Sequence, residues 1–340
     1  MDYDLQREKK KKRIAWVSYI VVILCLIGMF CFSADTGSLK VSFPELLKGL
    51  FLEYNEDVYT IYDLRFPRIL IAVLAGAAVA TSGCLFQAVL KNPLADPGIL
   101  GISSGAGLAS VAILAVAPQL YFFTPIFAFV GGCIAFGLVY ALSWKGGVSP
   151  MRMILVGVAL DACFTGLLDA CDSLSGGNLS SVTSIVDSNI TQKTWSDVGT
   201  LFPYVLVGLL LAVCCAGMCN LLSLEEQTAR SLGVPVDRNR FLVSVIAVLL
   251  ASISTAVAGP ISFLGLLVPH IGRILVGSNH RMLLPFSMLF GATLFLLADT
   301  LGRTICYPYE ISASIIMCCV GGPFFILLLR RSKNYANAES

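Results

Sequence analysis

Three aspartates on one apolar run are the residues whose spacing most suggests chemistry. Asp161, Asp169 and Asp172 stand at positions i, i+8 and i+11 of the run 152–172. At 100° per residue they fall within about 80° of one another on a helix. Carboxylates inside an apolar helix are costly in lipid and usually face a cavity or a partner. The pattern predicts that the three line a water-filled pathway. The alternative is that Asp169 and Asp172 lie at the outer interface and only Asp161 is buried.

Enzymatic chemistry leaves no comparable signal. The sequence has no GxxxxGK[ST] phosphate-binding loop, no HExxH and no GxSxG, which are the motifs of nucleotide, zinc-protease and hydrolase sites. It has only two histidines, His270 and His280, and its twelve cysteines lack CxxC or Cys/His spacing. We therefore expect no catalytic residue, no metal ligand and no cofactor bound by this chain.

A second informative stretch is "QAVLKNPLADPGILGISSGAG", residues 87–107, which lies between two apolar runs. Asn92-Pro93 and Asp96-Pro97 are expected to break the helix, because proline lacks a donor N–H and disfavours helix at the residue before it. Irregular backbone at membrane depth is tolerated only where protein or water covers it. The segment is therefore interpreted as a gate at the inner end of a bundle, with a purely structural turn as the alternative. The part of the segment after Pro97 contains small residues that permit close helix packing: Gly98, Gly101, Gly105 and Gly107.

The elements that must position these residues are membrane helices. Hydrophobic residues make up 57% of the 340, charged residues 13%, and the mean hydropathy is +0.84, whereas a soluble domain has about 25% charged residues. Apolar runs of about 20 residues, enough to cross a ~30 Å hydrocarbon core, recur along the chain. The sequence thus predicts an all-α polytopic membrane protein with about ten transmembrane helices. They are expected at 14–33, 66–88, 100–117, 122–144, 152–172, 199–222, 240–258, 260–276, 283–301 and 311–330.

The distribution of basic residues gives the orientation. With the chain starting inside, links on the cytoplasmic side hold 17 of the 23 lysines and arginines. The positive-inside rule therefore predicts that both termini are cytoplasmic. We divide the chain into a basic N-terminus (1–13), a single transmembrane domain (14–331) and a tail (332–340). Within the domain, the inner link 223–239 is expected to hold a short amphipathic helix from Leu224 to Leu232, which Gly233 and Pro235 end.

Several blocks of the sequence closely resemble the FecCD-type permease subunits of type II ABC importers, the family of iron–siderophore, haem and vitamin B12 permeases. The resemblance is carried by "LRFPRILIAVLAGAAVATSGCLFQAVLKNPLADPGILGISSGAG" (64–107), "ARSLGVPVDRNR" (229–240), "AGPISFLGLLVPHIGRILVGSNHRMLLPFSMLFGATLFLLADTLGR" (258–303) and "GGPFFILLLRR" (321–331). It implies a multi-pass permease of the bacterial cytoplasmic membrane that works as a dimer. Two ATPase subunits would supply ATP and Mg²⁺ chemistry, and an extracytoplasmic binding protein would deliver the ligand.

The resemblance also implies roles for individual residues. Arg65, Arg68 and Arg303 match rim arginines that dock carboxylates of the binding protein, a task suited to the bidentate guanidinium. Asn92 and Leu94 match the cytoplasmic gate. The loop 223–240 would couple to the ATPase, and its candidate contact residues are Glu225, Glu226, Ala229, Arg230, Leu232 and Gly233.

Two departures from the family pattern affect these assignments. A tryptophan-glycine-serine element is replaced by "SSVTSIVDSNITQKTWSDV", in which only Trp195 is retained, and Glu-Leu-Pro-Val-Gly reads "EISAS" (310–314). The outer gate is therefore placed by position only, at Ser175, Gly176 and Gly177, which complete the predicted pathway. The departures favour a heterodimer with a second permease over a homodimer.

The predicted function is import of a metal chelate driven by ATP, with ferric siderophore first and haem or a cobamide as alternatives. Acidic lining would suit a cationic or hydroxyl-rich chelate better than a strongly anionic one. A different class, an ion-coupled secondary transporter, stays open from the residues alone, because the aspartate stripe could bind the coupling ion.

Overall fold

The protein is a bundle of long helices. The computed structural model describes residues 2–36, 56–143, 150–175, 190–306 and 309–336, and these ranges contain helices and no strand. The helices are α1 (Asp2–Asp35), α3 (Glu56–Leu90), α4 (Ile102–Val116), the 3₁₀ helix η1 (Pro118–Phe123), α5 (Thr124–Ser143), α6 (Pro150–Ser175), α8 (Trp195–Cys214), α9 (Ala216–Leu222), α10 (Glu226–Ser231), α11 (Val236–Ala258), α12 (Leu264–Val276), α13 (His280–Thr304) and α14 (Ala313–Ala336).

The predicted membrane spans are confirmed. Seven segments of the described chain are long and apolar enough to cross a membrane, and three shorter apolar helices, in α4, α12 and α14, supply the remaining positions. Each predicted run coincides with a helix, except that 199–222 is divided between α8 and α9 at Cys215. The basic N-terminus is helical too, because α1 begins at Asp2 and its lysines and arginines are good helix formers.

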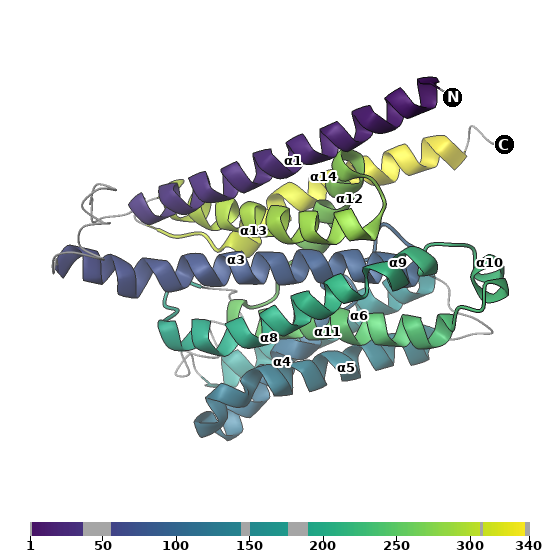
Figure 1. The fold of residues 1–340 in the computed structure, drawn as a ribbon. Coiled ribbons are helices and arrows are strands. Elements are labelled where there is room, and N and C mark those ends of the chain that lie inside the picture. The colour runs from purple at the N-terminus through teal and green to yellow at the C-terminus, as the bar shows by residue number, and fades with distance from the viewer. Residues whose placement is uncertain (1, 37–55, 144–149, 176–189, 307–308, 337–340) are drawn as a thin grey trace.

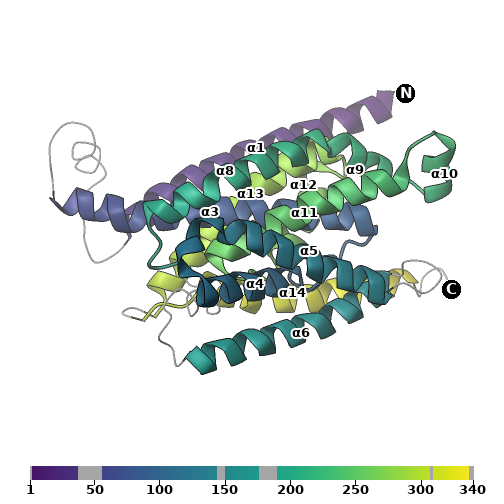
Figure 2. The ribbon, with the colours of Figure 1, turned by 90° about the horizontal axis from the view of Figure 1, so that it is seen from below.

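Helix α3 is the central element of the bundle (Figure 1). Most of its span is buried (83%), and it packs against α8, α11, α12 and α13. By contrast, only 11% of the residues in an 18-residue apolar stretch of α1, and likewise of α6, are buried, and the two helices lie at opposite edges (Figure 2). Helix α3 therefore fixes the positions of its neighbours, while α1 and α6 present large apolar side chains to their surroundings.

Close packing around α3 depends on pairs of glycines. A Cβ atom placed on Gly83 would lie 2.1 Å from the carbonyl oxygen of Gly265 in α12, and one on Gly76 would lie 2.5 Å from that of Gly291 in α13. No side chain fits at such distances. Membrane helices gain stability mainly from packing and interhelical hydrogen bonds, so small residues at the contact allow the backbones to approach.

Pro269 lies within the eighth predicted span, 260–276, and does not interrupt its helix. Helix α12 continues through it, although proline removes the N–H that would bond to the carbonyl of Gly265 four residues earlier. The side chain of Gln87 replaces that donor, because its Nε2 lies 3.1 Å from the Gly265 oxygen. The helix is thus repaired by a side chain of α3.

Both described ends of the chain lie at the same end of the bundle. The start of α1, the end of α14 and the short helix α10 are together in both views (Figures 1 and 2). This agrees with the charge-based prediction that the two termini and the 223–239 link share the cytoplasmic side.

Candidate functional site

At the outer end of the bundle, Arg68 is the centre of a buried ion cluster. Its Nη2 and Nε atoms lie 2.9 and 3.0 Å from Asp299 Oδ1, and its Nη1 lies 2.8 Å from Glu310 Oε2. Arg68 is 6% exposed and Asp299 is 1% exposed. A buried arginine needs such partners, because an unpaired charge there would be strongly destabilising. The cluster fastens α3 to α13 and to the segment before α14.

The other two predicted docking arginines lie at the same end. Arg303 forms an ion pair with Asp299, with its Nε 3.4 Å from Oδ2, and donates to the Ser33 hydroxyl. Arg65 Nη1 donates to the Ala34 carbonyl over 2.8 Å. The structure therefore brings all three arginines together and ties Arg65 and Arg303 to the outer end of α1. Their docking role stays a prediction, and Arg68 is committed to internal partners.

Glu310 is the more accessible acid of this cluster, with 39% of its side chain exposed. Partial burial opposes its charge, but hydrogen bonds from Arg68 and Thr191 and the nearby Arg303 outweigh it and hold the pKa of Glu310 below its usual 4.5. The carboxylate is therefore ionised and bridges the arginine to the segment that precedes α8.

At the inner end, the predicted break between two spans is confirmed. Helix α3 ends at Leu90, α4 begins at Ile102, and the connection between them contains only turns. The Asn92 side chain accepts a hydrogen bond from the Leu94 N–H at 3.0 Å, which fixes the first turn. The fully buried Asp96 side chain accepts a hydrogen bond from the Gly98 N–H, with 2.8 Å between Asp96 Oδ1 and the Gly98 nitrogen. The candidate gate residues Asn92 and Leu94 are both partly buried in this short segment.

Gln87 connects the candidate gate to the rest of the bundle. Besides repairing α12, its Nε2 lies 3.3 Å from the Ala95 carbonyl, and its Oε1 accepts from Arg273 Nη1. It is 3% exposed. One amide side chain therefore joins the end of α3, the turn that follows it and α12, so a movement of α12 would reach the gate directly.

Of the six predicted pathway residues, the structure describes the side chains of Asp161 and Asp169. Asp161 is half-buried where α6 crosses the start of α4, and a Cβ atom on Gly101 would lie 3.1 Å from its backbone nitrogen. Asp169 is exposed. Asp172 and Ser175 belong to α6, but their side chains, together with Gly176 and Gly177, lie outside the described residues. Lining of a pathway stays a prediction.

The candidate coupling element is shorter than expected and is confirmed as a helix. Helix α10 covers Glu226–Ser231, and Gly233 follows it with a φ of +75°, a conformation that favours glycine. Leu232 is 65% exposed, whereas Ala229 is 1% exposed and anchors the helix. Glu225 is exposed just before the helix.

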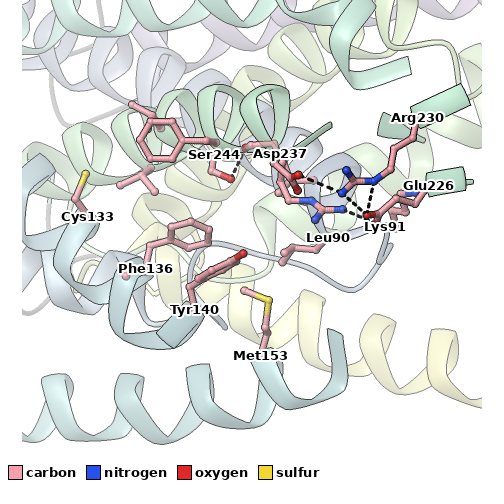
Figure 3. Close-up of a pocket in the computed structure, with 16 residues that line it drawn as sticks. Leu90, Lys91, Cys133, Phe136, Tyr140, Met153, Glu226, Arg230, Asp237 and Ser244 are labelled. Atoms are coloured by element: carbon pink, nitrogen blue, oxygen red, sulfur yellow. Dashed lines mark hydrogen bonds and ion pairs between the residues drawn. The ribbon is translucent and has the colours of Figure 1, made fainter. Parts of the chain in front are cut away.

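Charged residues hold α10 to the start of α11 (Figure 3). Arg230 Nη2 lies 2.9 Å from Glu226 Oε1 and 3.1 Å from Asp237 Oδ2, and Arg240 Nη2 lies 3.4 Å from Glu226 Oε2. Because Asp237 and Arg240 belong to α11, a displacement of α10 would be transmitted to a membrane span. Within the described part of the chain, Arg240 is linked to α10 by this one contact with Glu226, and a partly exposed ion pair contributes little, so the attachment is of modest strength.

Two residues of these regions were not predicted from the sequence, Gln87 and Asp299, whereas Asp96 was predicted only as part of the helix break. Asp299 carried a usable signal, since an acid in an apolar run requires a buried partner and an arginine in another run can supply it. Among the described residues, no group of three His, Cys, Asp or Glu side chains lies close enough together to hold a metal ion.

Comparisons with known proteins agree with this architecture. Residues 22–331 match the model of the FecCD transport family. The chain is 42% identical, over 96% of its length and 98% of theirs, to proteins of Staphylococcus aureus strains MSSA476 and Newman, each named "Probable heme-iron transport system permease protein IsdF".

Solved structures give the same picture. One described as an inward-facing conformation of a metal-chelate type ABC transporter superposes with a TM-score of 0.75 at 29% identity, covering 92% of this chain and 98% of that chain. PsaBC from Streptococcus pneumoniae, in complex with Fab, shares the fold with a TM-score of 0.57 at 18% identity, over 84% of this chain and 95% of that one. These similarities agree with the architecture of the described chain. It has ten apolar helices, a broken connection after the second of them and a short cytoplasmic helix before the seventh. The chain belongs to the FecCD transport family and is a multi-pass permease of an ABC importer for metal chelates in the cytoplasmic membrane.

Proposed function

We propose that this permease imports haem iron. The observation that carries the proposal is the 42% identity, over nearly the whole of both chains, to relatives named as heme-iron permeases. For this reason we propose haem as the first candidate, although the residues alone favoured a ferric siderophore.

Ferric siderophore is the second candidate, and the carboxylates of α6 favour it. If Asp161 and Asp169 line the pathway, they would repel the propionates of haem and attract a cationic or hydroxyl-rich chelate. The variant with both residues changed to asparagine separates the cases. If haem is the cargo, this variant should take up haem faster than the wild type and its siderophore uptake should not change. If a ferric siderophore is the cargo, the variant should lose siderophore uptake.

The proposed assembly contains two permease chains, two ATPase subunits that use ATP and Mg²⁺, and an extracytoplasmic binding protein. Helix α6 is the proposed permease interface, because it carries exposed apolar side chains beside its carboxylates. Met151, Leu155, Val158 and Leu167 are each more than half exposed. The departures from the family pattern near 175–195 and at 310–314 favour a paralogous second permease.

In this assembly, each candidate site has a task. Arg65 and Arg303 dock the binding protein at the outer end, and Asn92 and Leu94 close the inner end. Helix α10 contacts the ATPase, and its ion pairs pass the movement to α11. Serine and glycine at 175–177 would form the outer gate.

The test is transport into proteoliposomes that contain the permease, its ATPase and its binding protein. Haem, a ferric siderophore and cobalamin are each supplied with ATP or with a non-hydrolysable analogue. Haem accumulation that requires ATP hydrolysis and the binding protein would establish the function. Accumulation of only another chelate would refute haem as the cargo. Uptake that begins only when a second permease is added would establish the heterodimer, and uptake without ATP would point to an ion-coupled mechanism.

A further inference from the structure

A cavity of about 990 Å³ lies beside α10, between the cytoplasmic halves of α5 and α11. It is separate from the outer ion cluster and from the pathway residues of α6. Two of the candidate coupling residues, Glu226 and Arg230, line its mouth, but none of the candidate residues lines its apolar wall. Figure 3 shows the cavity with aromatic rings on one wall and charged side chains at one end.

The inner wall of the cavity is apolar. Phe136 and Tyr140 come from the last two turns of α5, and Val248 comes from α11. Arg240 stands at the mouth on the same helix as Val248, eight residues earlier, which corresponds to about 12 Å along the helix axis. The cavity therefore extends from the level of the charged residues into the depth of the membrane spans.

The mouth of the cavity carries an excess of positive charge. Lys91, Arg230 and Arg240 line it, against two acids, Glu226 and Asp237. Both acids bond to Arg230, whereas Arg240 has one contact of 3.4 Å, to Glu226. Within the part of the chain that the structure describes, the buried Arg240 Nε–H has no acceptor. This guanidinium therefore has unused donor capacity where an anion could be bound.

We propose that the cavity binds an anionic phospholipid of the cytoplasmic leaflet. Arginine suits its phosphate, because the guanidinium donates two parallel hydrogen bonds to phosphate oxygens. Basic side chains at this level attract anionic headgroups. The apolar wall accepts an acyl chain, which a free anion lacks. The bound lipid fills the space between a membrane span and the helix that contacts the ATPase. This inference is independent of which chelate is transported.

The experiment uses the assembled permease–ATPase complex in nanodiscs of phosphatidylglycerol mixed with phosphatidylcholine. After extraction, native mass spectrometry measures the lipid retained by each complex. We expect phosphatidylglycerol to be enriched about five-fold over its share of the mixture, and Arg240→Gln to remove that enrichment, the size of effect given by one basic residue at a membrane surface. Arg238→Gln is the matched control, because Arg238 is exposed on the same helix and does not line the cavity.

A second variant tests the acyl-chain part of the site. Val248→Trp fills the cavity and leaves the mouth charges in place, so it should reduce retention of both lipids, while size-exclusion chromatography reports whether the complex is still folded. Enrichment that is equal in wild type and Arg240→Gln would overturn the proposal. So would displacement by inorganic phosphate, which would indicate a simple anion site. Lipid retained by the permease alone and expelled by the ATPase would assign the cavity to a protein segment instead.

Discussion

Arg68 and Asp299 are 231 positions apart in the sequence, yet their side chains form a bidentate pair in the interior of the bundle. The pair joins the central helix α3 to α13 at the outer end. Because both side chains are almost fully buried, neither can exchange its partner for water.

Asp299→Asn should therefore destabilise the permease. The change leaves the buried guanidinium of Arg68 without its main counter-charge, and loss of one partner from a buried pair costs about 3–5 kcal/mol. Thermal unfolding in detergent measures the effect as a lower midpoint. Asp169→Asn is the control, since it removes the same charge from an exposed position on α6. Equal midpoints for the two variants would contradict the structural role of the cluster.

Gly83→Ala should prevent normal packing of α3 on α12. The added methyl would lie 2.1 Å from the backbone oxygen of Gly265, and backbone cannot move aside as a flexible side chain would. Overpacking of this kind costs about 1–3 kcal/mol or more. The measurement is the folded fraction in size-exclusion chromatography together with the unfolding midpoint. Gly199→Ala, on a helix with nothing within 4 Å of the added atom, should behave as wild type or slightly better.

Stability should fall in acid partly through Glu310. Its pKa is lower in the folded protein than its usual 4.5, chiefly through the hydrogen bond from Arg68 that overcomes burial. The stabilisation is therefore complete above pH about 4.5 and is lost as the pH falls through the lowered pKa. Glu310→Gln should lose the part of the pH dependence that sets in as the pH falls below about 4.5, followed as unfolding midpoint against pH. The same change at exposed Glu225 should leave the profile of the wild type intact.

Leu232→Glu should weaken assembly with the ATPase. Leu232 is 65% exposed at the end of α10, and an apolar side chain at a contact loses binding energy when a charge replaces it. We expect about ten-fold weaker association, which corresponds to a residue of ordinary importance at an interface, measured by titrating labelled ATPase onto the permease in nanodiscs. Val116→Glu makes the same change at the outer end of α4, where Val116 is 84% exposed. If both variants weaken association equally, α10 is not the contact.

The order and type of the elements could be predicted from sequence because they depend on local signals. Apolar runs of the right length gave the spans, and proline after asparagine or aspartate gave the break between α3 and α4. The short helix before Gly233 was also predictable, since its end is encoded by the glycine itself. Only its length differed, because Leu224, Glu225 and Leu232 do not enter the helix.

Partners between distant segments could not be predicted in the same way. No local pattern tells that Arg68 faces Asp299, and so a side chain that resembled a free docking group is bonded within the chain. The role of Gln87 is equally remote from its sequence neighbours, since it depends on a proline 182 positions later in α12. The aspartates of α6 show the opposite limit. Their helical spacing puts them on one helix, α6, but spacing alone does not tell what that face of the helix meets.

The attachment of α10 has a consequence for the conditions under which the transporter works. One buried alanine and a small set of surface ion pairs hold this helix to α11. Exposed ion pairs weaken as salt rises, because the screening length shrinks from about 10 Å at 0.1 M to about 3 Å at 1 M ionic strength. In the proposed assembly, the helix that contacts the ATPase is thus joined to the membrane bundle by a salt-sensitive link, whereas α3 and its glycine contacts are indifferent to salt. The number of ATP molecules used per transported chelate should therefore depend on the ionic strength of the cytoplasm more strongly than the stability of the permease does.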